Sequence, residues 1–233
     1  METLADILEP YKESIGNGAM VVTIIQMLSG IQLCLDIYMQ DKSEGIPIMP
    51  FAGGFVVSAL NLKYGYIILD QTMIIVNFVG VALNLIYLTI YYLYSRQKKI
   101  VRWQVGRATA LTITLLVYAH WEDAELVEKR FGMITTVLLL GLIASPLFSL
   151  NTIIKTQSTE GMPFPVIATG TVVAIMWLLY GIALKNGFIV VPNVVALLLC
   201  AVQMSLFVIY PSKPKPVEKP KSKSKKILKR RRD

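Results

Sequence analysis

Two asparagines, Asn77 and Asn193, each follow a tyrosine–glycine pair by twelve residues, inside strongly apolar stretches. A carboxamide is uncharged and carries two N–H donors and one carbonyl acceptor, so it can bind the hydroxyl groups of a neutral polar ligand. The alternative is structural, because polar side chains in membrane helices also bind neighbouring helices for about 0.6–2 kcal/mol. The matched placement of the two asparagines favours ligand binding.

The two asparagines belong to an internal duplication with a period of 116 residues. This period is too long for a solenoid, whose repeats are about 20–50 residues long. Both copies are apolar, so we expect two like bundles of membrane helices with a site between them. On this register Tyr64-Gly65 matches Tyr180-Gly181, Glu44-Gly45 matches Glu160-Gly161, Pro47 matches Pro163, and Asn61 stands opposite Trp177.

The composition describes an integral membrane protein. The 233 residues are 55% hydrophobic and only 16% charged, with a mean hydropathy of +0.58, which is too apolar for a soluble domain. The net charge of +8 does not predict a nucleic-acid partner, because eleven of the 23 Lys and Arg lie in the last 23 residues. Cys34 and Cys200 lie in apolar runs and give neither a disulfide framework nor metal-ligand spacing.

The apolar runs predict an all-α fold with seven transmembrane helices. Each must supply about 20 residues to cross the bilayer, and only the fourth run is shorter. A single linking helix gives both three-helix repeats the same orientation, so the repeat is parallel. The runs are 17–38, 49–68, 72–94, 106–119, 131–153, 164–184 and 188–210.

The same runs divide the chain into five parts. Residues 1–14 lack a positively charged segment, so we expect no cleaved signal peptide. The predicted parts are a short extracellular N-terminus (1–16), the first three-helix repeat (17–94), the linker helix and its loops (95–130), the second three-helix repeat (131–210) and a polybasic cytoplasmic tail (211–233).

The distribution of Lys and Arg predicts the orientation in the membrane. With the N-terminus outside, the cytoplasmic segments hold 18 of these residues and the opposite side holds 5. Cytoplasmic loops carry the excess of positive charge in membrane proteins, so we expect an extracellular or lumenal N-terminus and a cytoplasmic C-terminus. The tail and the basic turn from Arg96 to Arg102 decide this count.

The second half of the chain contains Ser145-Pro146-Leu147, the loop from Ser158 to Phe164, Met176-Trp177, Tyr180-Gly181 and Pro192-Asn193. These motifs resemble those of the SWEET family of sugar transporters, in its animal-type members. The resemblance implies two three-helix repeats joined by a linker helix, and facilitated, bidirectional diffusion of mono- or disaccharides without a cofactor. It also implies the plasma membrane or Golgi apparatus as location, and homo-oligomers. Membrane lipid is expected as a partner because the charge of the basic tail attracts anionic lipid.

The resemblance assigns a substrate site to Asn77, Asn193, Trp177 and Asn61. Trp177 can stack its indole on a sugar ring, whereas its structural alternative is an interfacial anchor. Asn61 stands where many animal relatives have an aromatic residue, so the two halves of the pocket should differ. The proline near the inner end of the first helix in plant members is also missing, and Gly30-Ile31 stands there.

The resemblance further suggests hinges and a gate. Pro47, Pro50, Pro146 and Pro163 are hinge candidates, because a proline removes a backbone N–H from the helix ladder. Pro47 and Pro163 can equally be simple helix starts. Tyr64 and Tyr180 can form an extracellular gate by hydrogen-bonding to Asp70 and Asn186, and the alternative is an aromatic belt.

Enzymatic chemistry has no candidate site in this sequence. His120 lies beside Glu122 and Asp123 in a predicted loop, with no nucleophile–base pair or metal spacing, so we expect no enzyme and no metal site. Two other functions fit seven spans. A proton-coupled transporter with a Pro-Gln loop needs a dipeptide that is absent here, and a non-transporting receptor or scaffold for charged peptide ends needs intramembrane charges.

Overall fold

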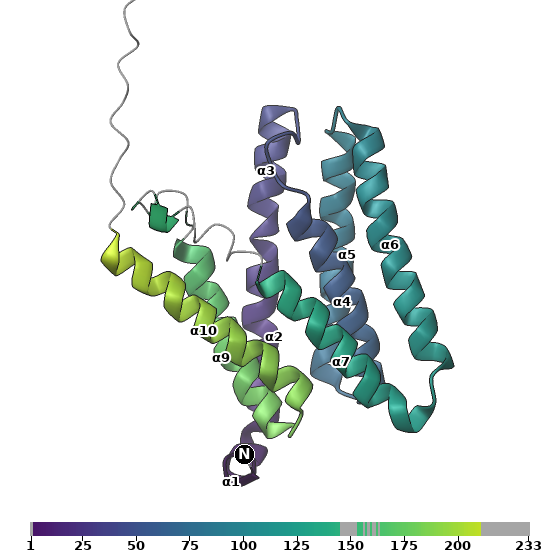
Figure 1. Cartoon of the computed structure of the whole chain (residues 1–233), viewed down its shortest axis with the longest axis vertical. Coiled ribbons are helices and arrows are strands. Elements are labelled where there is room, and N and C mark those ends of the chain that lie inside the picture. The colour runs from purple at the N-terminus through teal and green to yellow at the C-terminus, as the bar shows by residue number, and fades with distance from the viewer. Residues whose placement is uncertain are drawn as a thin grey trace, which may run out of the picture.

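The computed structural model describes residues 2–144, 153–155, 157, 159, 162 and 164–210, and these residues contain helices and no strand (Figure 1). Each long helix corresponds to one of the apolar runs, so the all-α prediction is confirmed. The elements are α1 (Glu2–Leu8), η1 (Glu9–Tyr11), α2 (Lys12–Leu28), α3 (Gly30–Gln40), α4 (Met49–Ile67), α5 (Gln71–Leu93), α6 (Lys98–Trp121), α7 (Ala124–Ile143), α9 (Phe164–Ala183) and α10 (Gly187–Ile209).

The long helices form two groups with the same internal packing. In the first repeat α4 packs along α5 and α2 contacts α5; in the second repeat α9 packs along α10 and α7 contacts α10. The two repeats meet through α2 with α9 and through α4 with α7, a pair of contacts that a two-fold rotation would exchange. The linker helix α6 packs against α4 at the edge of the bundle (Figure 1). The predicted plan of three, one and three helices is confirmed.

The first membrane helix is interrupted at Ser29, between α2 and α3. Gly30 lacks a side chain, and a Cβ there would lie 2.5 Å from the Tyr87 ring of α5. The Tyr87 hydroxyl donates a hydrogen bond to the carbonyl of Met27, at 3.1 Å. A close aromatic contact therefore coincides with the break in the helix, at the position where the sequence lacks a proline.

Two helix boundaries correct the sequence prediction. The linker helix begins at Lys98 and not at 106, and it includes His120, which was predicted to lie in a loop. Helix α7 begins at Ala124 and not at 131. In both cases charged turns extend the helix past the apolar run, because backbone hydrogen bonding does not require an apolar side chain.

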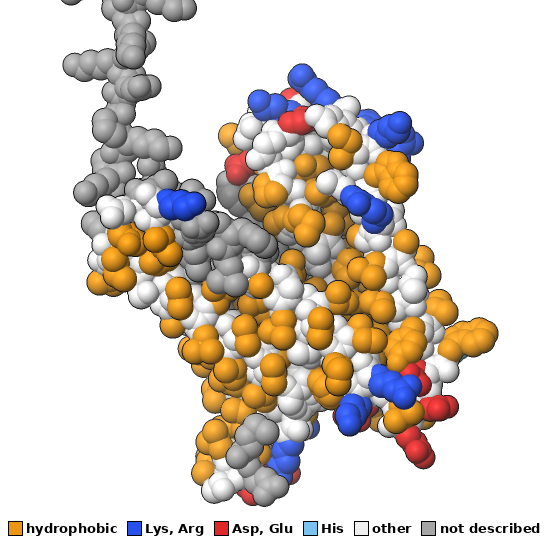
Figure 2. All heavy atoms as spheres, in the orientation of Figure 1, with side chains coloured by type: hydrophobic (Ala, Val, Ile, Leu, Met, Phe, Trp, Pro, Cys, Tyr) orange, Lys and Arg blue, Asp and Glu red, His pale blue; other side chains and the backbone are white. Residues whose placement is uncertain are grey.

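The surface fits a membrane protein. Among the described residues, four segments are long and apolar enough to span a membrane by length and composition: Thr3–Gln40, Gln71–Leu93, Phe164–Ala183 and Gly187–Ile209. In the face shown in Figure 2, charged side chains gather at the two ends and hydrophobic side chains cover the middle. We call the end with α1 and the α4–α5 and α9–α10 turns the N-terminal end, and the other the opposite end.

Candidate functional site

A cavity of about 300 Å³ lies between the two repeats. All four predicted substrate residues, Asn61, Asn77, Trp177 and Asn193, line it. Its volume is at the lower end of the range for small-molecule sites. The described lining contains no Asp, Glu, Lys, Arg or His, and its other polar side chains are Thr23, Gln26, Ser58, Tyr64, Thr135 and Thr136.

Asn77 and Asn193 have the same local geometry in the two repeats. The amide nitrogen of Asn77 donates to the carbonyl of Met73 at 2.8 Å, and that of Asn193 donates to the carbonyl of Ile189 at 2.7 Å. Both bonds lie within one helix, and neither carboxamide is bonded to another helix among the described residues. Each carboxamide therefore has one N–H and its carbonyl oxygen without a partner among the described residues.

Trp177 and Asn61 make the two halves of the cavity unequal. The indole N–H of Trp177 donates to the Thr23 hydroxyl at 2.8 Å, across the interface of the two repeats, and that hydroxyl donates to the carbonyl of Ala19 at 2.6 Å. The indole therefore offers a ligand its ring and not its N–H. Asn61 has no hydrogen-bond partner among the residues that the structure describes, so its carboxamide remains available in the cavity.

Two hydrogen bonds join the repeats at the N-terminal end of the cavity. The Tyr180 hydroxyl donates to the Asp70 carboxylate at 2.6 Å, and the Asn186 amide donates to the Tyr64 hydroxyl at 2.8 Å. Both tyrosines are buried. The sequence named these four residues as hydrogen-bonding partners, and the structure shows that each bond pairs a tyrosine of one repeat with a residue of the other.

Asp70 and Asn186 are held in place by the same local structure. Asp70 is the N-cap of α5 and accepts from the Met73 backbone N–H at 2.8 Å. Asn186 is the N-cap of α10 and accepts from the Phe188 N–H at 3.0 Å. An N-cap side chain satisfies a backbone donor that the helix leaves open, so each residue is fixed before it meets a tyrosine.

The sequence model of the family described as "Sugar efflux transporter for intercellular exchange" matches residues 13–99 and 129–215, one match for each repeat. The chain belongs to the SWEET family of sugar transporters. Members of this family are sugar transporters and not enzymes.

Known SWEET proteins resemble this chain over most of its length. It is 34% identical to "Sugar transporter SWEET1" of Drosophila pseudoobscura pseudoobscura over 203 residues, which are 85% of this chain and 89% of the relative. It is 29% identical to "Sugar transporter SWEET1" of Homo sapiens, over 86% of this chain and 92% of that protein. A solved eukaryotic SWEET transporter shares the fold, with a TM-score of 0.80 and 21% identity, covering 89% of this chain and 100% of that one.

Two of the four hinge candidates of this SWEET chain, Pro47 and Pro50, lie just before and at the start of α4. Pro47 lies in the connection before α4, and Pro50 is the second residue of α4, where a missing N–H leaves the helix ladder intact. Pro146 and Pro163 lie outside the described residues. The hinge role of all four prolines stays a prediction. Pro192, which was not predicted as a hinge, lies inside α10 and lines the cavity.

Pro192 leads to a contact that sequence reasoning missed. A proline cannot donate to the carbonyl four residues earlier, which here belongs to Phe188. The hydroxyl of Thr136, from α7, donates to that carbonyl at 3.2 Å. In the first repeat, Val76 stands at the position of Pro192 and Met20 at that of Thr136. The repeat register therefore did not indicate a contact between α7 and α10 at this point.

Two glycines were also missed, although the register could have revealed them. Gly16 and Gly132 are 116 residues apart, in the first helix of each repeat. A Cβ at Gly16 would lie 2.8 Å from the Tyr180 ring, and one at Gly132 would lie 2.7 Å from the Phe188 ring. Each glycine therefore makes room for an aromatic side chain beside the cavity or its closed end.

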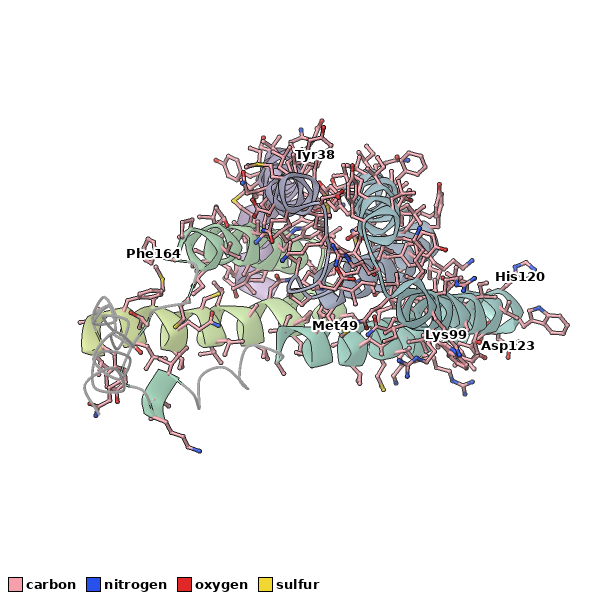
Figure 3. The ribbon with its side chains drawn as sticks, turned by 90° about the horizontal axis from the view of Figure 1, so that it is seen from above. Tyr38, Met49, Lys99, His120, Asp123 and Phe164 are labelled. Carbon is pink, nitrogen blue, oxygen red and sulfur yellow. The ribbon has the colours of Figure 1, made fainter. Side chains whose placement is uncertain are left out.

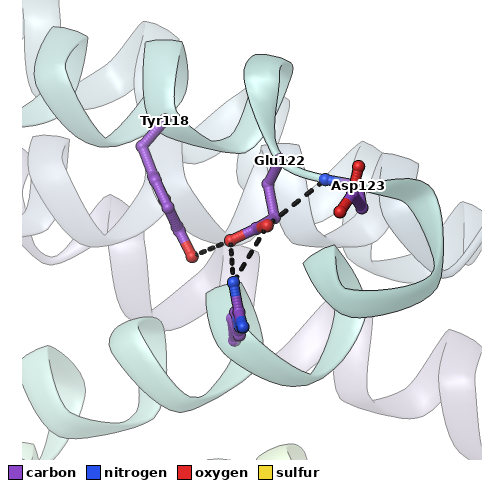
Figure 4. A network of polar contacts seen from close by, with 4 residues as sticks. Tyr118, Glu122 and Asp123 are labelled. Carbon is purple, nitrogen blue, oxygen red and sulfur yellow. Dashed lines mark hydrogen bonds and ion pairs between the residues drawn. The ribbon is translucent and has the colours of Figure 1, made fainter.

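The polar cluster at the end of α6 lies away from the cavity. Figure 3 shows His120 and Asp123 at the outer edge of the molecule. Glu122 accepts a hydrogen bond from the Tyr118 hydroxyl (Figure 4). Its two carboxylate oxygens also accept from one guanidinium nitrogen of Arg130, at 3.1 and 3.0 Å. Tyr118 and then Arg130 lower the pKa of this carboxyl. Within the described residues no group of three His, Cys, Asp or Glu could hold a metal.

Proposed function

We propose that this protein carries a small neutral sugar across a membrane by facilitated, bidirectional diffusion. The observation that carries the proposal is the cavity between the repeats, in which Asn77 and Asn193 present free donors and acceptors from equivalent positions. Sugar hydroxyls need such uncharged partners, and Trp177 adds an aromatic face. The SWEET relatives that the chain resembles are named sugar transporters.

Alternating access is the mechanism that this geometry supports. The two cross-repeat bonds of Tyr64 and Tyr180 hold the N-terminal end closed. Release of a sugar at that end requires both bonds to break and the repeats to separate there. The contacts of α2 with α9 and of α4 with α7 are equivalent, so a rocking motion about them would open one end as it closes the other.

We further propose that the N-terminal end faces the outside or the lumen, of the plasma membrane or the Golgi apparatus. The described Lys and Arg near the opposite end, and the eleven of the tail, would then lie in the cytoplasm. Tags at each terminus, probed with an antibody in intact and permeabilised cells, would test this orientation. Staining of the C-terminal tag in intact cells would contradict it.

Uptake into proteoliposomes tests the function and ranks the substrates. The purified full chain should equilibrate at least one of labelled glucose, galactose, fructose, sucrose and trehalose faster than protein-free vesicles do. Preloading with the unlabelled sugar should accelerate entry of the label, which is expected for a carrier that works in both directions. A folded protein that moves none of these sugars would favour the receptor or scaffold alternative.

A further inference from the structure

The first turns of α6 carry an exposed basic and aromatic face that the transport site does not use. Lys99, Arg102, Trp103 and Arg107 follow one another at spacings of three, one and four residues, so they share one side of the helix. All four are exposed, and shallow grooves of about 510 and 380 Å³ run between them. Neither ion pair of the described residues involves these three cations.

Two tryptophans give the depth of this face in the membrane. Trp103 is 66% exposed and Trp121 is 83% exposed, near the two ends of α6. They are 18 residues apart, which is about 27 Å along a helix. This separation is close to the ~30 Å thickness of the hydrocarbon core, and exposed tryptophans prefer its two interfaces. Trp103 therefore marks the interface at the opposite end of the molecule.

Arg107 lies on the hydrocarbon side of that interface. It comes four residues after Trp103, about 6 Å further along the helix. An exposed arginine at this depth needs an anionic partner or a path to the interface. Side chains of a helix lean towards its N-terminus, so the guanidinium of Arg107 can reach back towards Arg102. Exposed apolar residues follow on α6, namely Leu111, Ile113 and Val117.

We propose that this face binds the headgroup of an anionic phospholipid. Arg102 and Arg107 would hold the phosphate, because a guanidinium offers paired donors that match phosphate oxygens. Lys99 would attract the additional negative charge of the headgroup, and Trp103 would pack beside the glycerol. Figure 2 shows Lys and Arg side chains beside hydrophobic ones over this part of the molecule.

The depth and charge of this face favour a lipid over other occupants. The chain's own tail is excluded, because its eleven Lys and Arg would be repelled by the three cations. A soluble acidic protein could meet Lys99, but it could not follow the face below Trp103 to Arg107. A phospholipid offers its phosphate at the interface and its acyl chains to the apolar residues below.

Lipid enrichment in nanodiscs tests the proposal. The full chain would be reconstituted in phosphatidylcholine mixed with a minor amount of phosphatidylserine, and the lipids retained would be counted by native mass spectrometry. The Arg102→Gln, Arg107→Gln double variant should lose preference for phosphatidylserine by about fivefold for each cation removed. The matched control is Lys12→Gln, Lys129→Gln, which removes the same charge at the N-terminal end and should retain the preference.

Other outcomes would overturn the proposal. An unchanged preference in the arginine double variant would show that the tail or general charge attracts the lipid. Inorganic phosphate or glycerophosphoserine would be added as competitors. If either bound to this face as strongly as the intact lipid does, the face would be a simple anion site. Dissociation of an oligomer in the variant would show instead that the face joins copies of the chain.

Two further measurements separate lipid binding from misfolding. Arg107→Lys keeps the charge and loses only the paired donors, so it should lose less preference than Arg107→Gln. Sugar uptake in phosphatidylcholine alone should be unchanged in the double variant, because the face lies on α6 and contributes nothing to the cavity. If Arg107→Lys lost as much preference for phosphatidylserine as Arg107→Gln, the positive charge of Arg107 would not explain the preference.

Discussion

At the scale of single residues, a carboxamide in the cavity is useful only where its second N–H and its oxygen stay free. The amide group of Asn77 donates one hydrogen bond to a carbonyl of its own helix, and so does that of Asn193. The second N–H and the carbonyl oxygen of each side chain have no partner among the described residues. This local bond also fixes the rotamer, so in the proposed function the free groups would be oriented before a sugar binds, which would lower the entropic cost of binding.

Asn77→Ala and Asn193→Ala should each weaken sugar binding by about 5- to 150-fold, because an unpaired polar group costs about 1–3 kcal/mol. Uptake kinetics in proteoliposomes would measure this. Asn84→Ala is the matched control, since Asn84 also donates to the carbonyl four residues earlier in α5, at 2.8 Å, but does not line the cavity. Normal uptake by a folded Asn77→Ala, Asn193→Ala double variant would contradict the assignment.

The tyrosine bonds at the N-terminal end should control access to the cavity. Tyr180→Phe removes the donor to Asp70, and a hydrogen bond to a charged group is worth about 1.5–3 kcal/mol, so the open state should become at least several-fold more populated. A cysteine placed at Thr135, with Cys34 and Cys200 replaced, should then react faster with an impermeant thiol reagent added at that end.

Tyr118→Phe supplies the control for this measurement. It also removes a hydroxyl bonded to a carboxylate, that of Glu122, but far from the gate. Its thiol reactivity should match that of the parent. Equal reactivity in Tyr180→Phe and the parent would mean that the bond to Asp70 does not hold the cavity closed.

At the scale of the elements, α7 and α10 are joined where α10 lacks a backbone donor. Pro192→Ala restores an N–H that can pair with the Phe188 carbonyl, so the bond from Thr136 should matter less in that background. Thr136→Val should therefore lower the melting temperature more in the parent than in Pro192→Ala. Thr135→Val is the control, because Thr135 donates within α7 to Gly132 at 3.0 Å and should act additively with Pro192→Ala.

The corner between α6 and α7 should depend on pH through Glu122. Tyr118 and Arg130 lower the pKa of its carboxyl, so its contribution to stability is present above the ordinary pKa of glutamate and is lost as the pH falls through the lowered value. Glu122→Gln should therefore lower the melting temperature in detergent at neutral pH and should differ less from the parent in acid. Glu125→Gln, an exposed neighbour, should show no such pH-dependent difference.

Helix positions could be predicted from the sequence better than helix ends. Hydropathy locates the lipid-facing part of a helix, but α6 and α7 continue through charged turns that hydropathy does not include. Asp70 and Asn186 could be named as partners of the two tyrosines because all four residues obey the repeat register, but the register did not show which tyrosine each would meet. The hydrogen bonds of Thr23 with Trp177 and of Thr136 with the Phe188 carbonyl could not be predicted, because the two threonines have Leu139 and Met20 as their counterparts in the other repeat. Only the packing of the helices brings each threonine to its partner.

At the scale of the whole molecule, the two repeats are equivalent in packing and unequal in chemistry. The caps Asp70 and Asn186 occupy matching positions, yet one is an acid and the other an amide. Asp70 is buried at the N-terminal end and is bonded to Tyr180, outside the described lining of the cavity. The acid therefore pairs with a residue of the other repeat and does not face the proposed sugar site.

Transport should consequently be uncoupled from protons and sodium. Proton coupling at the substrate site needs a group that titrates there, and the described lining of the cavity has no Asp, Glu, Lys, Arg or His. A stripped sodium ion would also lack a compensating carboxylate there. Imposed pH or sodium gradients should therefore leave the final sugar level in proteoliposomes at equilibrium. Accumulation of sugar above equilibrium that an ionophore abolishes would contradict this prediction. If Asp70→Asn also removed the accumulation while sugar exchange persisted, Asp70 would be the coupling group of a proton-driven transporter.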